Sequence, residues 1–483
     1  MQSAGIRSAV PVRSTAIVSV LLLTCSVVRA HPQPTDLRDL ANHATVEDTS
    51  ISQAATARLR AAGPEGLAAL IDANSQAVRQ HREGTASQND PGWIRVAAAI
   101  DSVAAQKDAW ASGLYWYTDL DAARVAARQQ GKPILSLRLL GTLDSEYSCA
   151  NSRFFRTVLY ANADVSKALS SHFILHWKSV RPVPKVTIDF GDGRVVQRTI
   201  TGNSIHYVLD PDGNVIDGIP GLYGPKAFLR EVNNAAALEQ AMVRAKNESR
   251  FRELHKWRSN QILALWQSDL KKVGALPNDP PAPPAGTGAG APGNANPPAA
   301  AAAARRAASK AVVEKPLVIA LSPDPQVLES SSKDEVWVRI AELHADDARL
   351  DQESRMVMAT KYPTALGAGA TAVAKGRFET PLLRVVHNFE RSIALDTVKN
   401  EYTFHRQIHE WLAAGRLPDG KSSRDVDALN ERVYADLFLT PSSDPWLGLL
   451  PPDTYSALPN DGSCLPEVAA APSAQQTAPI TKK

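Results

Sequence analysis

The fold is decided by residues 131–225, which begin with Gly131-Lys132-Pro133 and the apolar run ILSLRLL (134–140). Such a run is typical of a buried strand. A loop with Cys149, a helix, a second apolar run HFILHW (172–177) and a strand-turn-strand pattern, HYVLDPDGNVID (206–217), follow. Between the last two, the stretch 179–200 reads as a hairpin with Gly191-Asp192-Gly193 at its tip. This order predicts a central α/β domain.

The N-terminus has the layout of a secretory signal. Arg7 and Arg13 precede the apolar run TAIVSVLLLTCSVV (15–28), and Ala30 precedes His31-Pro32. This order predicts a signal peptide over residues 1–30, because the run is shorter than the roughly 20 apolar residues that cross a bilayer. We therefore expect a periplasmic or secreted protein with no transmembrane segment in the mature chain.

Composition narrows the class of partner. The formal net charge is +3, with 53 basic and 50 acidic residues among 483, so no global charge calls for a nucleic-acid partner. Since the chain is expected outside the cytoplasm, its expected partners are other exported proteins.

The chain is predicted to have an ordered region on each side of the α/β domain. Residues 274–311 are nearly all Pro, Ala, Gly and Asn and cannot bury enough apolar surface to fold. The predicted regions are a helical N-terminal region (31–112), the α/β domain (113–235), a long amphipathic helix (236–273), a disordered linker (274–311), a separate α-rich C-terminal domain (312–465) and a disordered tail (466–483).

Three motifs in order resemble the thioredoxin-fold superfamily over Tyr115 to Val232. They are GKPIL (131–135), the C-x-x-S from Cys149 to Ser152, and HYVLDPDGNVID (206–217). The resemblance implies a thioredoxin-like domain with a thiol-disulfide oxidoreductase or isomerase activity. Two departures weaken the dithiol mechanism: Ser152 stands where the family has the resolving cysteine, and Ser204 stands where it has a cis-proline.

Cys149 allows two interpretations. At the start of a helix near Asn151, with Arg153 close by, its thiolate would be stabilised and could act as a monothiol. The candidate catalytic residues are then Cys149 and Ser152, and the candidate binding residues are Ser204 and Arg153. Alternatively, Cys149 is a small buried residue, and the protein is a non-enzymatic binding or scaffold protein. Cys464 is the other cysteine of the mature chain, and a bond between the two remains open.

One further pattern lies in the C-terminal region. Glu401, His405 and His409 are spaced four apart, so they share one face of a helix. Two histidines at this spacing can hold one metal ion, but a buried polar network is the alternative. No other helix is recognisable as a source of ligands. The sequence therefore predicts no metal and no cofactor, and it leaves the role of these residues open.

Overall fold

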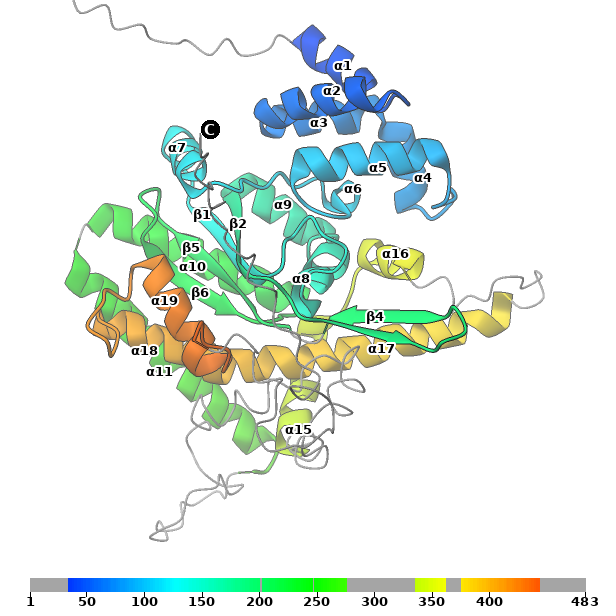
Figure 1. Cartoon of the computed structure of the whole chain (residues 1–483). Coiled ribbons are helices and arrows are strands. Elements are labelled where there is room, and N and C mark those ends of the chain that lie inside the picture. Colours follow the sequence, from blue (N-terminus) through cyan, green and yellow to red (C-terminus); the bar gives the residue numbers. More distant parts are fainter. Residues whose placement is uncertain (1–33, 200–201, 246, 276–334, 362–374, 444–483) are drawn as a thin grey trace, which may run out of the picture.

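The computed structural model describes residues 34–199, 202–245, 247–275, 335–361 and 375–443. The predicted signal peptide, nearly all of the predicted linker, the predicted tail and Cys464 lie outside these residues. A four-stranded mixed sheet forms the centre, and helical segments lie on both sides of it (Figure 1). No helix in the described part of the chain is long and apolar enough to cross a membrane.

The region before the sheet is helical and forms a second apolar core, to which Ala161 and Val357 from later in the chain also belong. Asp48 and Asp90 cap α2 and α5 by accepting hydrogen bonds from the first turn of each helix. Trp93, Ile100 and Leu59 are among the buried residues of this core. Its helices are α1 (Pro34–His43), α2 (Thr49–Ala61), α3 (Pro64–Ala73), α4 (Ser75–Arg82), α5 (Pro91–Ala104) and α6 (Ala109–Ser112).

The central sheet has the strand order β2-β1-β5-β6. Every residue of its central strand β1 is buried, as the apolar run 134–140 predicts. β1 is parallel to β2 and antiparallel to β5, which is in turn antiparallel to β6. The prediction of an α/β centre is therefore confirmed. The strands are β1 (Ile134–Leu140), β2 (Ile174–Arg181), β5 (Ser204–Leu209) and β6 (Val215–Pro220).

Helices join and cover these strands. Asp119 caps the helix before β1, and Gly131 ends it with a positive φ of 62°. On one face of the sheet, His206 contacts Phe155 and Phe228 from two covering helices. The helices are α7 (Leu120–Gln130), α8 (Ala150–Phe154), the π-helical turn η1 (Phe155–Leu159), α9 (Ala163–His172) and α10 (Pro225–Ala245).

A separate two-stranded hairpin projects from the sheet (Figure 1). It consists of β3 (Lys185–Asp189) and β4 (Val195–Thr199), with the predicted Gly191-Asp192-Gly193 tip between them. The turn of the central hairpin is also as predicted, because the Asp210 carboxylate accepts hydrogen bonds from the backbone N–H groups of Asp212 and Asn214.

The predicted long helix over 236–273 is wrong, because the chain forms two helices there. α10 ends at Ala245, and α11 (Glu248–Lys272) begins after Asn247. Asn247 has an extended backbone, and its side-chain oxygen accepts hydrogen bonds from the N–H groups of Ser249 and Arg250. An asparagine that caps the next helix in this way interrupts an otherwise helical pattern.

The C-terminal helices share one apolar core with the sheet. This core contains Leu137 of β1, Ile219 of β6 and Trp266 of α11 together with Ile408 and Leu429. The sequence predicted a separate domain here, whereas the described helices pack directly on the α/β unit. They are α15 (Glu335–Leu343), the 3₁₀ turn η2 (Ala345–Ala348), α16 (Gln352–Lys361), α17 (Lys375–Lys399), the π-helix η5 (Asn400–His405), α18 (Arg406–Ala414), α19 (Val426–Arg432) and the π-helical turn η6 (Val433–Leu437).

Candidate functional site

Cys149 lies directly before α8, at the position predicted from the sequence, and is its N-cap. Its side chain has no exposed surface. The thiol sulfur lies 3.5 Å from the Ser152 hydroxyl oxygen and 3.7 Å from the Asn203 carbonyl oxygen, the two acceptors within reach of its one hydrogen. The thiol is therefore part of the core.

The surroundings of Cys149 disfavour a thiolate. Burial raises the pKa of the Cys149 thiol, and its hydrogen bonds with Ser152 and the charge of Arg153 only partly oppose this effect. The Arg153 guanidinium is engaged elsewhere, since it donates to the Ser148 carbonyl at 2.8 Å and to the Thr199 hydroxyl at 2.5 Å. A thiol with a raised pKa and no exposed surface is a poor nucleophile.

The end of the described C-terminal segment closes the space around the thiol. The Tyr434 hydroxyl donates to the Asn203 carbonyl at 3.2 Å, and the Asn203 amide donates to the Thr440 hydroxyl at 3.1 Å. Ser204, the next residue, begins β5, is buried and pairs with Leu139. The predicted residues Cys149, Ser152, Arg153 and Ser204 therefore gather in one region, which lies beneath η6.

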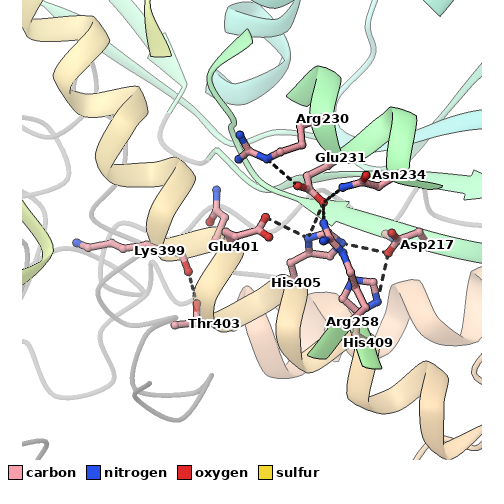
Figure 2. A network of polar contacts seen from close by, with 12 residues as sticks. Asp217, Arg230, Glu231, Asn234, Arg258, Lys399, Glu401, Thr403, His405 and His409 are labelled. Carbon is pink, nitrogen blue, oxygen red and sulfur yellow. Dashed lines mark hydrogen bonds and ion pairs between the residues drawn. The ribbon is translucent and has the colours of Figure 1, made fainter. Parts of the chain in front are cut away.

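A second group of polar side chains meets at the edge strand β6 (Figure 2). We call it the His–carboxylate cluster, and its members come from five elements. They are Asp217 of β6, Glu231 of α10, His255 and Arg258 of α11, Glu401 and His405 of η5, and His409 of α18. All except Arg258 are buried.

His405 occupies the middle of the cluster. Its Nε2 lies 3.1 Å from Asp217 Oδ1, and its Nδ1 lies 3.3 Å from Glu401 Oε2 and 4.0 Å from Glu231 Oε2 (Figure 2). His409 Nδ1 lies 3.9 Å from Asp217 Oδ1. On the far side, His409 Nδ1 is 2.8 Å from His255 Nδ1. Three imidazoles and three carboxylates thus meet, with contacts between 2.8 and 4.0 Å.

The cluster shifts the pKa of its members in opposite directions. Burial alone would lower the pKa of His405, but the Asp217 and Glu401 carboxylates outweigh it and raise this pKa to about 10. Burial lowers the pKa of His255 to about 4 and that of His409 well below its ordinary value. His405 is therefore the one imidazole of the three that holds a charge at neutral pH.

Glu231 and Asp217 have different neighbours. Glu231 accepts hydrogen bonds from Arg230 and Arg258, and an amide hydrogen from Asn234. Asp217 forms ion-pair contacts only with His405 and His409 among the described residues, and it accepts the N–H of Gly218 at 2.7 Å. Arginines therefore neutralise the Glu231 carboxylate, whereas the described residues that pair with the Asp217 carboxylate are histidines.

A cavity of about 270 Å³ opens beside the cluster. Glu231, Glu401 and Arg258 line it together with Tyr402, whose hydroxyl donates to Asp269 at 2.5 Å. The cavity therefore lies on the side of the cluster that Glu231, Glu401 and Arg258 form.

The sequence identified part of this cluster and missed the rest. The spacing of Glu401, His405 and His409 predicted a shared helix face, and the three do meet. Asp217, Glu231 and His255 were not predicted, because their contacts with His405 and His409 are formed only by the tertiary fold. Asp217 carries the one detectable signal, since it is a carboxylate in a strand whose six residues are all buried.

Comparisons of this chain with family models, curated proteins and solved structures give no match. The two sites are therefore interpreted from their own geometry.

Proposed function

We propose that this chain is a non-enzymatic, thioredoxin-like binding protein of the exported compartment, in which Cys149 is structural. The observation that carries the proposal is the complete burial of the Cys149 side chain. Disulfide exchange requires a thiolate that can reach a partner's disulfide. Burial opposes both requirements, because it raises the pKa of the thiol and keeps a partner away.

Topology supports the thioredoxin-like assignment. The sheet order β2-β1-β5-β6 combines a parallel pair with an antiparallel pair, and Cys149 follows the first strand at the start of a helix. This is the succession of elements for which the sequence resembled that superfamily. Fold alone does not carry an activity, and here Ser152 stands at the position of the resolving cysteine.

The β3–β4 hairpin is the surface that we propose contacts a partner. Val186 and Ile188 point to the same face as Val196, which pairs with Ile188 and is 37% exposed. Phe190, beside the tip, is 55% exposed. Among the described residues these strands pair only with each other, so no third strand covers either outer edge there. We propose that an extended segment of another exported protein adds to such an edge as a strand.

The thiol half of the proposal is tested by alkylation. Native protein is incubated with iodoacetamide between pH 7 and 9, and the modification of Cys149 is followed by mass spectrometry of its tryptic peptide. We expect modification only after unfolding in guanidinium chloride, where Cys149 reacts as a free cysteine. Rapid modification of the native protein, with a thiolate pKa below the ordinary value, would restore the monothiol interpretation.

The binding half is tested with a photo-reactive amino acid at position 186, on the same face as Val196, in cells that export the protein. Val196→Glu places a charge on the apolar face, whereas the matched control Gln197→Glu places the same charge on the opposite face. We expect one crosslinked partner that is lost with Val196→Glu and retained with Gln197→Glu and Cys149→Ser. Equal crosslinking in both glutamate variants contradicts the assigned surface, and a crosslink to a second copy contradicts the assigned partner.

A further inference from the structure

We infer that Asp217, His405 and His409 form a binding site for one divalent first-row transition-metal ion. One ligand atom of each residue lies within 4.8 Å of the others, and all three side chains are buried. Two imidazoles and one carboxylate are the donor set that zinc, iron(II) and manganese(II) use in proteins. Calcium and magnesium take oxygen donors instead, so the mixed donor set selects a transition metal.

The distances between donor atoms fit a shared ion. Two ligands about 2.1 Å from one metal lie roughly 3.0 Å apart in octahedral geometry and 3.4 Å apart in tetrahedral geometry. His405 Nε2 and Asp217 Oδ1 are 3.1 Å apart, which is within this range. His409 Nδ1 and Asp217 Oδ1 are 3.9 Å apart, and His409 Nδ1 also lies 2.8 Å from His255 Nδ1, so this nitrogen becomes the third donor when it exchanges the His255 contact for the ion.

Glu401 is placed as a positioning residue for this site. A metal-bound histidine usually gives its other ring nitrogen to a carboxylate, which fixes the orientation of the ring. Glu401 Oε2 lies 3.3 Å from His405 Nδ1, while His405 Nε2 faces Asp217. Binding of the ion at Nε2 therefore releases the proton that His405 holds toward Asp217 in the ion-free cluster, while Nδ1 keeps its hydrogen bond to Glu401.

Charge favours a metal ion at the Asp217 side of the cluster over one at the Glu231 side. A second group, Glu231, Glu401 and His405, also brings three donor atoms together. Arg258 and Arg230 pair with Glu231, however, and a guanidinium so close repels a cation. Among the described residues, no lysine or arginine pairs with Asp217.

One nitrogen of His409 has no partner in the described part of the chain, and it is not the nitrogen that lies near Asp217. The Nε2 atom of His409 is buried and has no hydrogen-bond partner in the described part of the chain. A ligand role for His409 therefore requires either that Nδ1 leaves His255 or that the ring turns Nε2 toward Asp217.

The inference is tested on the full mature chain, prepared without a histidine tag and stripped with a chelator. Zn²⁺ is titrated calorimetrically, and Co²⁺ is titrated by visible spectroscopy, because its d–d bands report nitrogen and oxygen ligation. We expect one ion per chain and a thermal unfolding midpoint that rises with free Zn²⁺. The absence of stoichiometric Zn²⁺ or Co²⁺ binding by the folded wild-type protein overturns the inference and does not depend on any variant.

Variants then assign the ligands. We expect Asp217→Asn and His409→Gln each to weaken Zn²⁺ binding by at least 100-fold, and Glu401→Gln to weaken it by about 10- to 100-fold. His176→Gln is the matched control, because His176 is equally buried but bonds to Ser136 in the sheet. Unchanged binding in a folded Asp217→Asn variant overturns the assignment. The result is separate from the proposed partner binding, which is measured at the hairpin.

Discussion

At the scale of single residues, a buried neutral histidine should make the fold sensitive to acid. His206 Nε2 accepts the Tyr160 hydroxyl at 2.6 Å, and burial lowers the pKa of His206 to about 3. The unfolded chain binds this proton near the ordinary pKa of 6.5, so the stabilising contribution is complete above that pH and is lost as pH falls toward 3. We expect the free energy of unfolding to fall by about 2–3 kcal/mol between pH 6.5 and 4.5 from this residue.

Urea unfolding at pH 7.0 and 4.5 measures this dependence, and His206→Gln provides the comparison. Glutamine keeps an acceptor for Tyr160 but does not titrate, so the variant should lose less stability between the two pH values than the wild type. An identical loss in both proteins would show that His206 does not cause the acid dependence. This histidine could not be distinguished from the sequence, because nothing in HYVLD indicates that its ring faces Phe155 and Phe228.

Because the sequence does not show tertiary contacts, only part of each candidate site was predictable. The spacing of His405 and His409 follows from helix geometry, so their common face was predictable. Their meeting with Asp217 was not, because that contact joins residues 188 positions apart in the sequence. Cys149 was placed correctly at a helix start, but its burial depends on η6 and Thr440, which lie almost 300 positions further along the chain.

At the scale of elements, the junction between α10 and α11 shows why the sequence predicts one long helix and the structure has two. The charged and apolar residues on both sides of Asn247 keep a helical pattern, so periodicity alone predicts continuity. The break comes from the Asn247 side chain, which caps α11. We expect Asn247→Ala to lower the free energy of unfolding by about 1 kcal/mol, since that is the usual contribution of an N-cap.

Urea unfolding compares this variant with Asn260→Ala, which removes the same side chain from an exposed position inside α11. Because alanine is the better helix former there, the control should be unchanged or slightly more stable. Hydrogen exchange should rise in the first turn of α11 in Asn247→Ala only. Equal effects in the two variants would argue that Asn247 is an ordinary surface residue. Asn247 fixes where α11 begins, and α11 carries both His255 and Arg258 of the His–carboxylate cluster.

At the scale of the whole molecule, one apolar core joins segments that the sequence assigned to different domains. The composition of residues 274–311 marks a change in the chain, and this suggested two independent domains. Composition cannot report which apolar faces meet. In the structure, the Trp266 ring of α11 lies 4.7 Å from the Trp337 ring of α15, and the Asn400 amide of η5 donates to the Leu222 carbonyl at 2.9 Å.

This shared core predicts that neither half folds alone. A fragment of residues 31–275 exposes the surfaces that contact α15, η5 and α18, so we expect it to bind a hydrophobic dye and to unfold without a cooperative transition. Mixed with a fragment of residues 335–483, it should regain a cooperative transition seen by calorimetry and circular dichroism, because the interface resembles a domain core. If the first fragment unfolds cooperatively at the same midpoint as the intact chain, the two halves are independent domains. The His–carboxylate cluster would then be a contact between domains, since Asp217 and His405 lie on opposite sides of the cut.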